Sequence, residues 1–196
     1  MAIRAIIFDC FGVLILRGRT ALFHDYPKLS SDIHDLELQS DYGYISRHEF
    51  NESIGSLVGL SSSEVDKRYW SGNVRNEPVF EVVREVRGEG KYKTGLLTNV
   101  GRDWLGDVLP AHERQALFDS EIISGDVGMI KPAREIYELS ALRLGVLPSE
   151  CVMIDDVESN VDGARGAGMQ GIVFVSVDQL RADLAILNED SNARAT

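Results

Sequence analysis

Strand-like and helix-like segments alternate through the second half of this 196-residue sequence, and this alternation limits the possible folds more than any other feature. A first apolar run, residues 3–9, is followed later by four short β-type runs, at residues 93–98, about 121–124, 151–154 and 171–175. Strands of one parallel sheet are joined by crossover helices, so the pattern predicts an α/β fold with a Rossmann-like, doubly wound parallel sheet.

The spacing of apolar residues between residues 16 and 77 is helical and interrupted, unlike the rest of the chain. Ser46 with Glu49 and Ser61 with Glu64 each form a capping box, which predicts helices that begin near residues 47 and 62. We therefore expect a Rossmann-like core from residues 1–15 and 78–188, an inserted small helical cap from residues 16–77, and a disordered polar tail at 189–196.

Prolines and glycines predict where the helices of the core begin and end. Pro78 favours a helix that ends at Gly88 to Gly90, and Pro132 favours a helix that ends at Gly145. We also expect a helix from about Arg102 to Val108 that Pro110 interrupts, and a helix through residues 160–167.

The charge and composition limit the partners and the location of the chain. A net charge of −11 disfavours binding to nucleic acid and favours cationic metals. The chain begins without a recognisable signal peptide, contains no apolar run of membrane-spanning length, and has two cysteines. We therefore expect a cytoplasmic protein without a membrane partner, and the sequence leaves open whether it is a monomer or a homodimer.

Polar residues follow several of the predicted strands at the point where each strand ends. Because ligands of such folds bind outside the carboxyl ends of the strands, these residues should converge on one site. Its members come from distant parts of the sequence: Asp9, Thr98, Asn99, Lys131, Asp155 and Asp156.

These residues lie in four ordered motifs, which are Phe8-Asp9-Cys10-Phe11-Gly12-Val13-Leu14, Leu97-Thr98-Asn99, residues 127–132 ending in Lys131-Pro132, and Ile154-Asp155-Asp156 with Asn160. In their order and spacing they resemble the motifs of the haloacid dehalogenase superfamily, in the branch with a helical cap inserted after the first motif. The resemblance covers nearly the whole chain and implies a hydrolase.

The resemblance also implies a role for each residue of the motifs. Asp9 would be the nucleophile that forms an aspartyl intermediate, since an ionised carboxylate needs no base. Lys131 would neutralise Asp9 and bind the substrate anion together with the Thr98 hydroxyl and the Asn99 backbone N–H. Mg²⁺ would be held by Asp9, the backbone carbonyl of Phe11 and Asp156, with Asp155 in close support. The substrate would be a small phosphorylated metabolite.

Phe11 departs from the phosphatase pattern, in which a second aspartate two residues after the nucleophile acts as general acid and base. An aromatic residue here is shared with 2-haloacid dehalogenases, which need no metal and release a halide that needs no proton. Asp155 and Asp156 favour the Mg²⁺-dependent phosphatase, because two carboxylates without a cation would repel a carboxylate substrate. A metal-independent dehalogenase and a degenerate, ligand-binding or partner-binding member remain as alternatives.

Other residues could contribute to the site. Cys10 beside Asp9 could be a reactive thiol, although a small packed residue is the favoured interpretation, and Trp104 is expected to pack between helix and sheet. Six residues of the predicted cap could reach over the site and select substrate: Arg17, Arg19, His24, Arg47, His48 and Trp70.

Overall fold

The computed structural model describes residues 2–16 and 24–193 and contains a central five-stranded parallel sheet. The order of its strands is β5-β4-β1-β6-β7, so β1 lies in the middle, and the chain crosses over between strands as the sequence predicts. The strands of this sheet are β1 (Ala5–Phe8), β4 (Lys93–Thr98), β5 (Ser120–Ile123), β6 (Cys151–Asp155) and β7 (Gln170–Val173).

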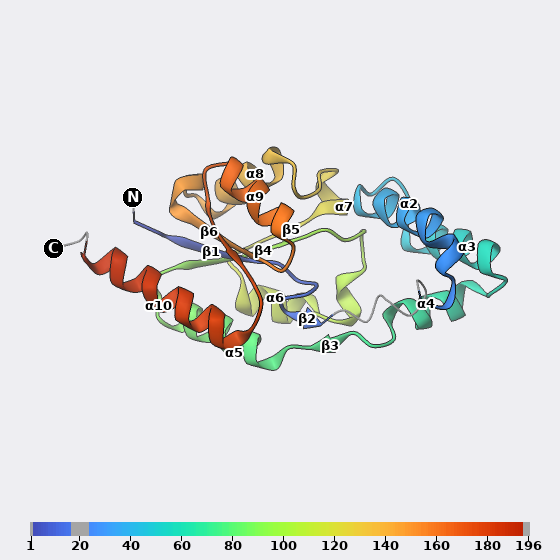
Figure 1. Cartoon of the computed structure of the whole chain (residues 1–196), viewed down its shortest axis with the longest axis horizontal. Helices are drawn as coiled ribbons and strands as arrows, with labels where there is room; N and C mark the ends of the chain where they lie inside the picture. The colour runs from blue at the N-terminus through green and yellow to red at the C-terminus, as the bar shows by residue number, and fades with distance from the viewer. Residues whose placement is uncertain (1, 17–23, 194–196) are drawn as a thin grey trace.

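Helices cover both faces of the sheet (Figure 1). One face is covered by α8 (Arg134–Leu144) and α9 (Glu158–Gly166). The opposite face is covered by α5 (Glu77–Gly88), α6 (Ala111–Leu117) and α10 (Val177–Ala193). Short helices complete the core: α7 (Ser124–Val127) and the 3₁₀ helices Leu105–Asp107 and Pro148–Glu150. The α/β doubly wound fold is therefore confirmed.

The alternation of side chains along β1 divides the apolar core between the two faces. Ile6 and Phe8 pack with α5 and α10, whereas Ala5 and Ile7 pack with α8 and α9. All four residues of β1 are buried because a central parallel strand has helices on both sides. The carboxyl end of this strand, where Asp9 follows Phe8, is thus held at the centre of the sheet edge.

Between the short antiparallel strands β2 (Ile15–Leu16) and β3 (Val74–Arg75), the chain forms a helical insertion at one end of the molecule (Figure 1). Its helices are α2 (Ser30–Asp41), preceded by the 3₁₀ helix Pro27–Leu29, α3 (Arg47–Val58) and α4 (Ser62–Trp70). Both predicted capping boxes are confirmed: Ser46 caps α3 and Ser61 caps α4, each with the glutamate three residues later.

Polar contacts among the described residues help to join the helical insertion to the core. At the end of α2, the Ser124 hydroxyl donates a hydrogen bond to the Asp41 carbonyl at 2.7 Å. On α3, Arg47 forms ion pairs at 2.7 Å with Asp66 of α4 and with Asp107 of the core, and its guanidinium lies over the ring of Trp104. These contacts hold α2 over the carboxyl edge of the sheet.

Two segments differ from the sequence-based expectations. Where a helix from Arg102 to Val108 was expected, the structure has only the short 3₁₀ helix, and Pro110 precedes α6 instead of interrupting a helix. Trp104 and Leu105 are buried in the core, so tertiary packing outweighs the helical spacing there. At the other end, the α10 backbone continues to Ala193, into the segment 189–196 for which a disordered tail was expected.

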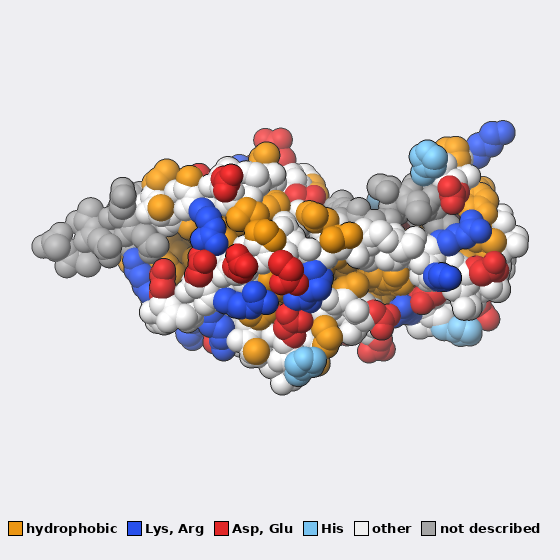
Figure 2. All heavy atoms as spheres, turned by 90° about the horizontal axis from the view of Figure 1, so that it is seen from below, with side chains coloured by type: hydrophobic (Ala, Val, Ile, Leu, Met, Phe, Trp, Pro, Cys, Tyr) orange, Lys and Arg blue, Asp and Glu red, His pale blue; other side chains and the backbone are white. Residues whose placement is uncertain are grey.

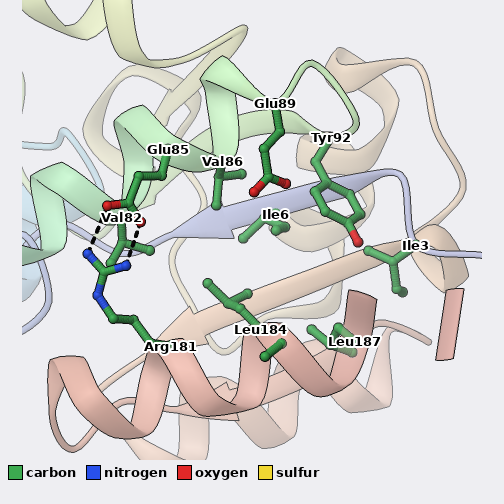
Figure 3. A pocket seen from close by; sticks show the side chains of 11 residues that line it. Ile3, Ile6, Val82, Glu85, Val86, Glu89, Tyr92, Arg181, Leu184 and Leu187 are labelled. Carbon is green, nitrogen blue, oxygen red and sulfur yellow. Dashed lines mark hydrogen bonds and ion pairs between the residues drawn. The ribbon is translucent and has the colours of Figure 1, made fainter. Parts of the chain in front are cut away.

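The face that carries α5 has ion pairs, and acidic and basic side chains lie next to one another on it (Figure 2). Arg75 pairs with Glu113, and Arg181 of α10 pairs with Glu85 of α5. Figure 3 shows the second pair beside a cavity of about 170 Å³ that Leu184 and Tyr92 help to line. Within residues 2–16 and 24–193, no helix combines the length and apolar character needed to span a membrane.

Candidate functional site

Asp9 lies at the carboxyl end of β1, with its side chain only 5% exposed. One carboxylate oxygen accepts a hydrogen bond of 2.7 Å from the backbone N–H of Cys10. The Asp9 backbone N–H bonds to the carbonyl of Ile154, which continues the β1–β6 pairing up to the site. The nucleophile candidate is therefore held by the sheet itself.

Lys131 lies between two carboxylates at this edge. Its ammonium is 2.8 Å from Asp9 and 2.6 Å from Asp155, and it also donates to the carbonyl of Leu97 at 3.1 Å. The side chain is 1% exposed, and the two carboxylates keep its pKa above the ordinary value of lysine despite burial. Lys131 thus carries its charge in the centre of the site and brings strands β1, β4 and β6 together.

Asp155 and Asp156 follow β6 but have different surroundings. Asp155 is fully buried and accepts hydrogen bonds from Lys131, from the Asn160 amide and from the backbone N–H of Val157. Asp156 lies beside Gly12, whose missing side chain makes room for it: a Cβ there would be 2.3 Å from the Asp156 carboxylate. The chain thus turns after Asp9 so closely that glycine is required at position 12.

Thr98 and Asn99 end β4 on the other side of β1. The Thr98 hydroxyl is buried and has no hydrogen-bond partner among the described residues. Such an atom is costly unless a ligand or water completes its hydrogen bonds. The Asn99 side chain donates to the Lys131 carbonyl at 2.9 Å and accepts from its backbone N–H at 2.8 Å. These two hydrogen bonds between the Asn99 side chain and the Lys131 backbone were not among the sequence-based expectations.

The pKa of Asp9 is raised from 3.8 to about 6. Burial is the largest cause, and the neighbouring carboxylates of Asp155 and Asp156 act in the same direction, whereas Lys131 lowers the pKa. Near neutral pH, the Asp9 carboxyl group is therefore ionised, although burial of its negative charge costs free energy. A further positive charge would relieve this cost.

Lys131→Met should destabilise the fold by about 3–5 kcal/mol, because it leaves two buried carboxylates without their cation. The free energy of unfolding in urea measures this loss. The control is Lys93→Met, since Lys93 is exposed and its side chain donates one hydrogen bond, to the Leu144 carbonyl. Equal urea midpoints of unfolding for the two variants would show that the buried ion pairs of Lys131 do not stabilise the fold.

Phe11 is 2% exposed and follows Asp9 in the turn after β1. Its ring packs against Trp70 of α4, with the centroids 5.9 Å apart. Trp70, a residue considered from the sequence, therefore reaches the site from the helical insertion, although its contact is with Phe11. The second residue after Asp9 is therefore a buried aromatic side chain and carries no carboxyl group.

A cleft of about 290 Å³, here called the Asp9 cleft, opens above these residues. Its core side is lined by Asp9, Phe11, Thr98, Asn99, Lys131, Val157 and Asn160. Its other side comes from one face of α2, with His34, Glu37, Leu38 and Asp41. The sequence reasoning missed these four residues. Their spacing along one helical face was a signal, but only the fold shows that this face turns toward Asp9.

Most of the other residues considered from the sequence do not line the Asp9 cleft. Arg17 and Arg19 lie outside the described residues. His24 and His48 are exposed and lie beside the carboxylates of Asp25 and Glu52. Arg47 and Trp104 belong to the contact between the helical insertion and the core. Cys10 is fully buried, as expected for a small packed residue.

The residues at the sheet edge fit a divalent cation. Asp9, Asp155 and Asp156 each offer a carboxylate oxygen, and these atoms lie within 4.8 Å of one another. The three negative charges exceed the single positive charge of Lys131. Magnesium prefers oxygen ligands and binds through one or two carboxylates completed by water and phosphate. The donor set and its excess charge therefore suit Mg²⁺.

Comparison with known proteins shows the family of the chain. A family model described as haloacid dehalogenase-like hydrolase matches residues 3–168. Pyrophosphatase PpaX from Bacillus cereus is 30% identical over 185 residues, which cover 86% of this chain and 81% of that protein. Human N-acylneuraminate-9-phosphatase is 32% identical over 101 residues, but the match covers only 40% of its length and 51% of this chain.

Solved structures of similar fold include a family enzyme with bound magnesium and a dehalogenase. A HAD family enzyme from Bacteroides thetaiotaomicron, in complex with magnesium, has a TM-score of 0.77 at 24% identity. The match covers 89% of this chain and 94% of that one. The L-2-haloacid dehalogenase of Xanthobacter autotrophicus has a TM-score of 0.61 at 20% identity, covering 93% and 82%. At these identities the likeness shows the shared fold alone, so the chemistry has to be argued from the site.

Proposed function

Because the chain belongs to the haloacid dehalogenase-like hydrolases, we propose that it is a Mg²⁺-dependent phosphatase of small phosphorylated metabolites. The observation that carries this proposal is the excess of carboxylates at the sheet edge, with Asp9, Asp155 and Asp156 around one ammonium. A cation and a phosphoryl group together would balance these charges, whereas a carboxylate substrate alone would not.

In the proposed reaction, an ionised Asp9 oxygen attacks phosphorus and forms an aspartyl phosphate, which water then hydrolyses. Lys131 reduces the repulsion between this carboxylate and the phosphoryl oxygens. The unpartnered Thr98 hydroxyl has the free donor that a phosphoryl oxygen requires. The backbone N–H of Asn99 would bind the same phosphoryl group. The Asn99 side chain would position Lys131, since it is hydrogen-bonded to the backbone N–H and carbonyl of that residue.

When bound, Mg²⁺ would neutralise the transferring phosphoryl group. Asp9, the backbone carbonyl of Phe11 and Asp156 are the proposed ligands. Both carboxylate oxygens of Asp155 already accept hydrogen bonds, and one of these bonds comes from Lys131. This favours a supporting role for Asp155 over direct ligation of the metal. The helical insertion, residues 16–77 in the proposed domain division, would act as the cap over the site.

Phosphate release from a panel that includes acetyl phosphate and p-nitrophenyl phosphate tests the function. We expect multiple turnovers with Mg²⁺ and loss of activity after chelation, restored when Mg²⁺ is added back. Binding of Mg²⁺ should also raise the melting temperature, since a ligand that binds only the native state stabilises the native state. Release that is unaffected by chelation would contradict the metal part of the proposal.

The second candidate is a dehalogenase, which Phe11 favours because a departing halide needs no proton. Halide release from 2-chloropropionate, unaffected by chelator, would support it. The third is a binding protein without turnover, for which ligands would raise the melting temperature while no phosphate or halide appears. Phosphate release above the background of an Asp9 variant excludes this third candidate.

A further inference from the structure

Phe11 leaves the proposed phosphatase without a carboxyl group that could donate a proton two residues after Asp9. Phosphate esters of ordinary alcohols need one, because the leaving oxygen must be protonated as its bond to phosphorus breaks. The titratable side chains known to line the Asp9 cleft are Asp9, Lys131, His34, Glu37 and Asp41. Asp9 is the nucleophile, and Lys131 is buried between two carboxylates. The remaining three all lie on α2.

Two of these three belong to one chain of interactions. The buried Tyr69 of α4 donates a hydrogen bond of 2.7 Å to Glu37 Oε1. The other oxygen of Glu37 lies 3.8 Å from Nδ1 of His34. Glu37 is 14% exposed and fixed by Tyr69, whereas His34 is 70% exposed at the edge of the cleft. This separation is longer than a hydrogen bond, so the Glu37 carboxylate attracts a protonated imidazole on its Nδ1 side and leaves Nε2 for proton transfer.

We propose that His34, oriented by Glu37, donates the proton to the leaving oxygen in place of the carboxyl group that Phe11 lacks. This inference rests on the proposed phosphatase function. Glu37 and Tyr69 are positioning residues. Histidine is the side chain that enzymes use most often for proton transfer, and the exposure of His34 gives its imidazole access to water.

The two half-reactions balance through His34. As Asp9 attacks, the bond from phosphorus to the leaving oxygen breaks, its electron pair goes to that oxygen, and His34 Nε2–H supplies the proton, so that the alcohol leaves. Neutral His34 then accepts a proton from water as the water oxygen attacks phosphorus. The bond to Asp9 breaks, which regenerates the Asp9 carboxylate and protonated His34 and releases inorganic phosphate.

His34→Gln should change the dependence of kcat/KM on the leaving group. For alkyl phosphates such as β-glycerophosphate we expect a loss of about 10²-fold, the low end for general acid catalysis. For p-nitrophenyl phosphate, whose leaving group needs no proton, kcat/KM should stay within a factor of ~3. Glu37→Gln should give a smaller loss with the same selectivity, which a merely structural defect would not produce.

His48→Gln is the matched control. His48 is also an exposed histidine of the helical insertion beside a glutamate, at 3.3 Å from Glu52, but it does not line the Asp9 cleft. It should leave both substrates unaffected. The Phe11→Asp background adds a second control: with a carboxyl restored near Asp9, His34→Gln should lose its effect on alkyl phosphates.

Several results would overturn this assignment. They are equal losses on both substrates, no loss in His34→Gln, a selective loss in Asp41→Asn instead, or a wild type that turns over p-nitrophenyl phosphate but no alkyl phosphate. Failure of the phosphatase function itself looks different, because neither substrate would then be hydrolysed faster than by Asp9→Asn.

Discussion

Asp9→Asn should reduce phosphate release by ~10⁴-fold or more on every substrate, the scale of loss seen when a nucleophile is removed. The amide has nearly the same shape as the carboxylate but cannot attack phosphorus. The rest of the site should remain in place, since Lys131 keeps its 2.6 Å ion pair with Asp155. Phosphate release by the two proteins at equal concentration gives the comparison.

The melting curve is the control for this variant. Burial raises the pKa of Asp9 to about 6 from 3.8. A raised pKa means that the stabilising contribution of Asp9 is present below pH 3.8 and is lost as the pH rises through about 6. Above this range the neutral asparagine avoids the cost of a buried charge, so loss of activity through unfolding is not expected. Full activity in a folded Asp9→Asn protein would exclude Asp9 as the nucleophile.

Phe11→Asp should increase kcat/KM for alkyl phosphates by about 10²-fold, while p-nitrophenyl phosphate changes much less. The new carboxyl group would stand two residues from Asp9 and could protonate the leaving oxygen from the core side of the cleft. The gain is expected at the low end of general acid catalysis because His34 already donates in the wild-type protein. Steady-state kinetics on both substrates with saturating Mg²⁺ measures it.

This substitution has a cost in stability. Phe11 is buried and packs against Trp70, so its removal should lower the free energy of unfolding by about 3–5 kcal/mol. Phe11→Asn is the matched control, because it creates the same cavity but cannot transfer a proton at neutral pH. A similar gain in both variants would mean that opening the apolar wall, and not proton transfer, limits the wild-type protein.

Local sequence signals predicted much of the core. β4 occupies residues 93–98 as expected, and both capping boxes begin their helices at the predicted places, because a strand of apolar residues and a capped helix are specified by neighbours in the sequence. The helix expected from Arg102 to Val108 was wrong. Its apolar residues Trp104 and Leu105 are buried by packing partners that are distant in sequence, which helical spacing cannot reveal.

The sequence predicted the core side of the Asp9 cleft but not the side that α2 forms. Asp9, Thr98 and Lys131 follow from strand ends, which meet at one edge of any parallel sheet. The α2 side depends on the contacts that hold the helical insertion, such as Ser124 with Asp41 and Tyr69 with Glu37. These contacts join residues far apart in the chain, so the sequence offered no means of choosing His34 over the exposed His24 or His48.

The central claim is that phosphate is transferred through Asp9, and trapping the intermediate tests it most directly. Wild-type protein mixed with p-nitrophenyl phosphate and Mg²⁺, then quenched in acid, should show the mass of one added phosphoryl group. Borohydride reduces an aspartyl phosphate to homoserine and releases the phosphate, so peptide mapping should find homoserine in place of Asp9. Both the phosphoryl adduct and the homoserine should be absent from Asp9→Asn. A phosphoryl group on another residue, or steady phosphate release by Asp9→Asn, would contradict the account.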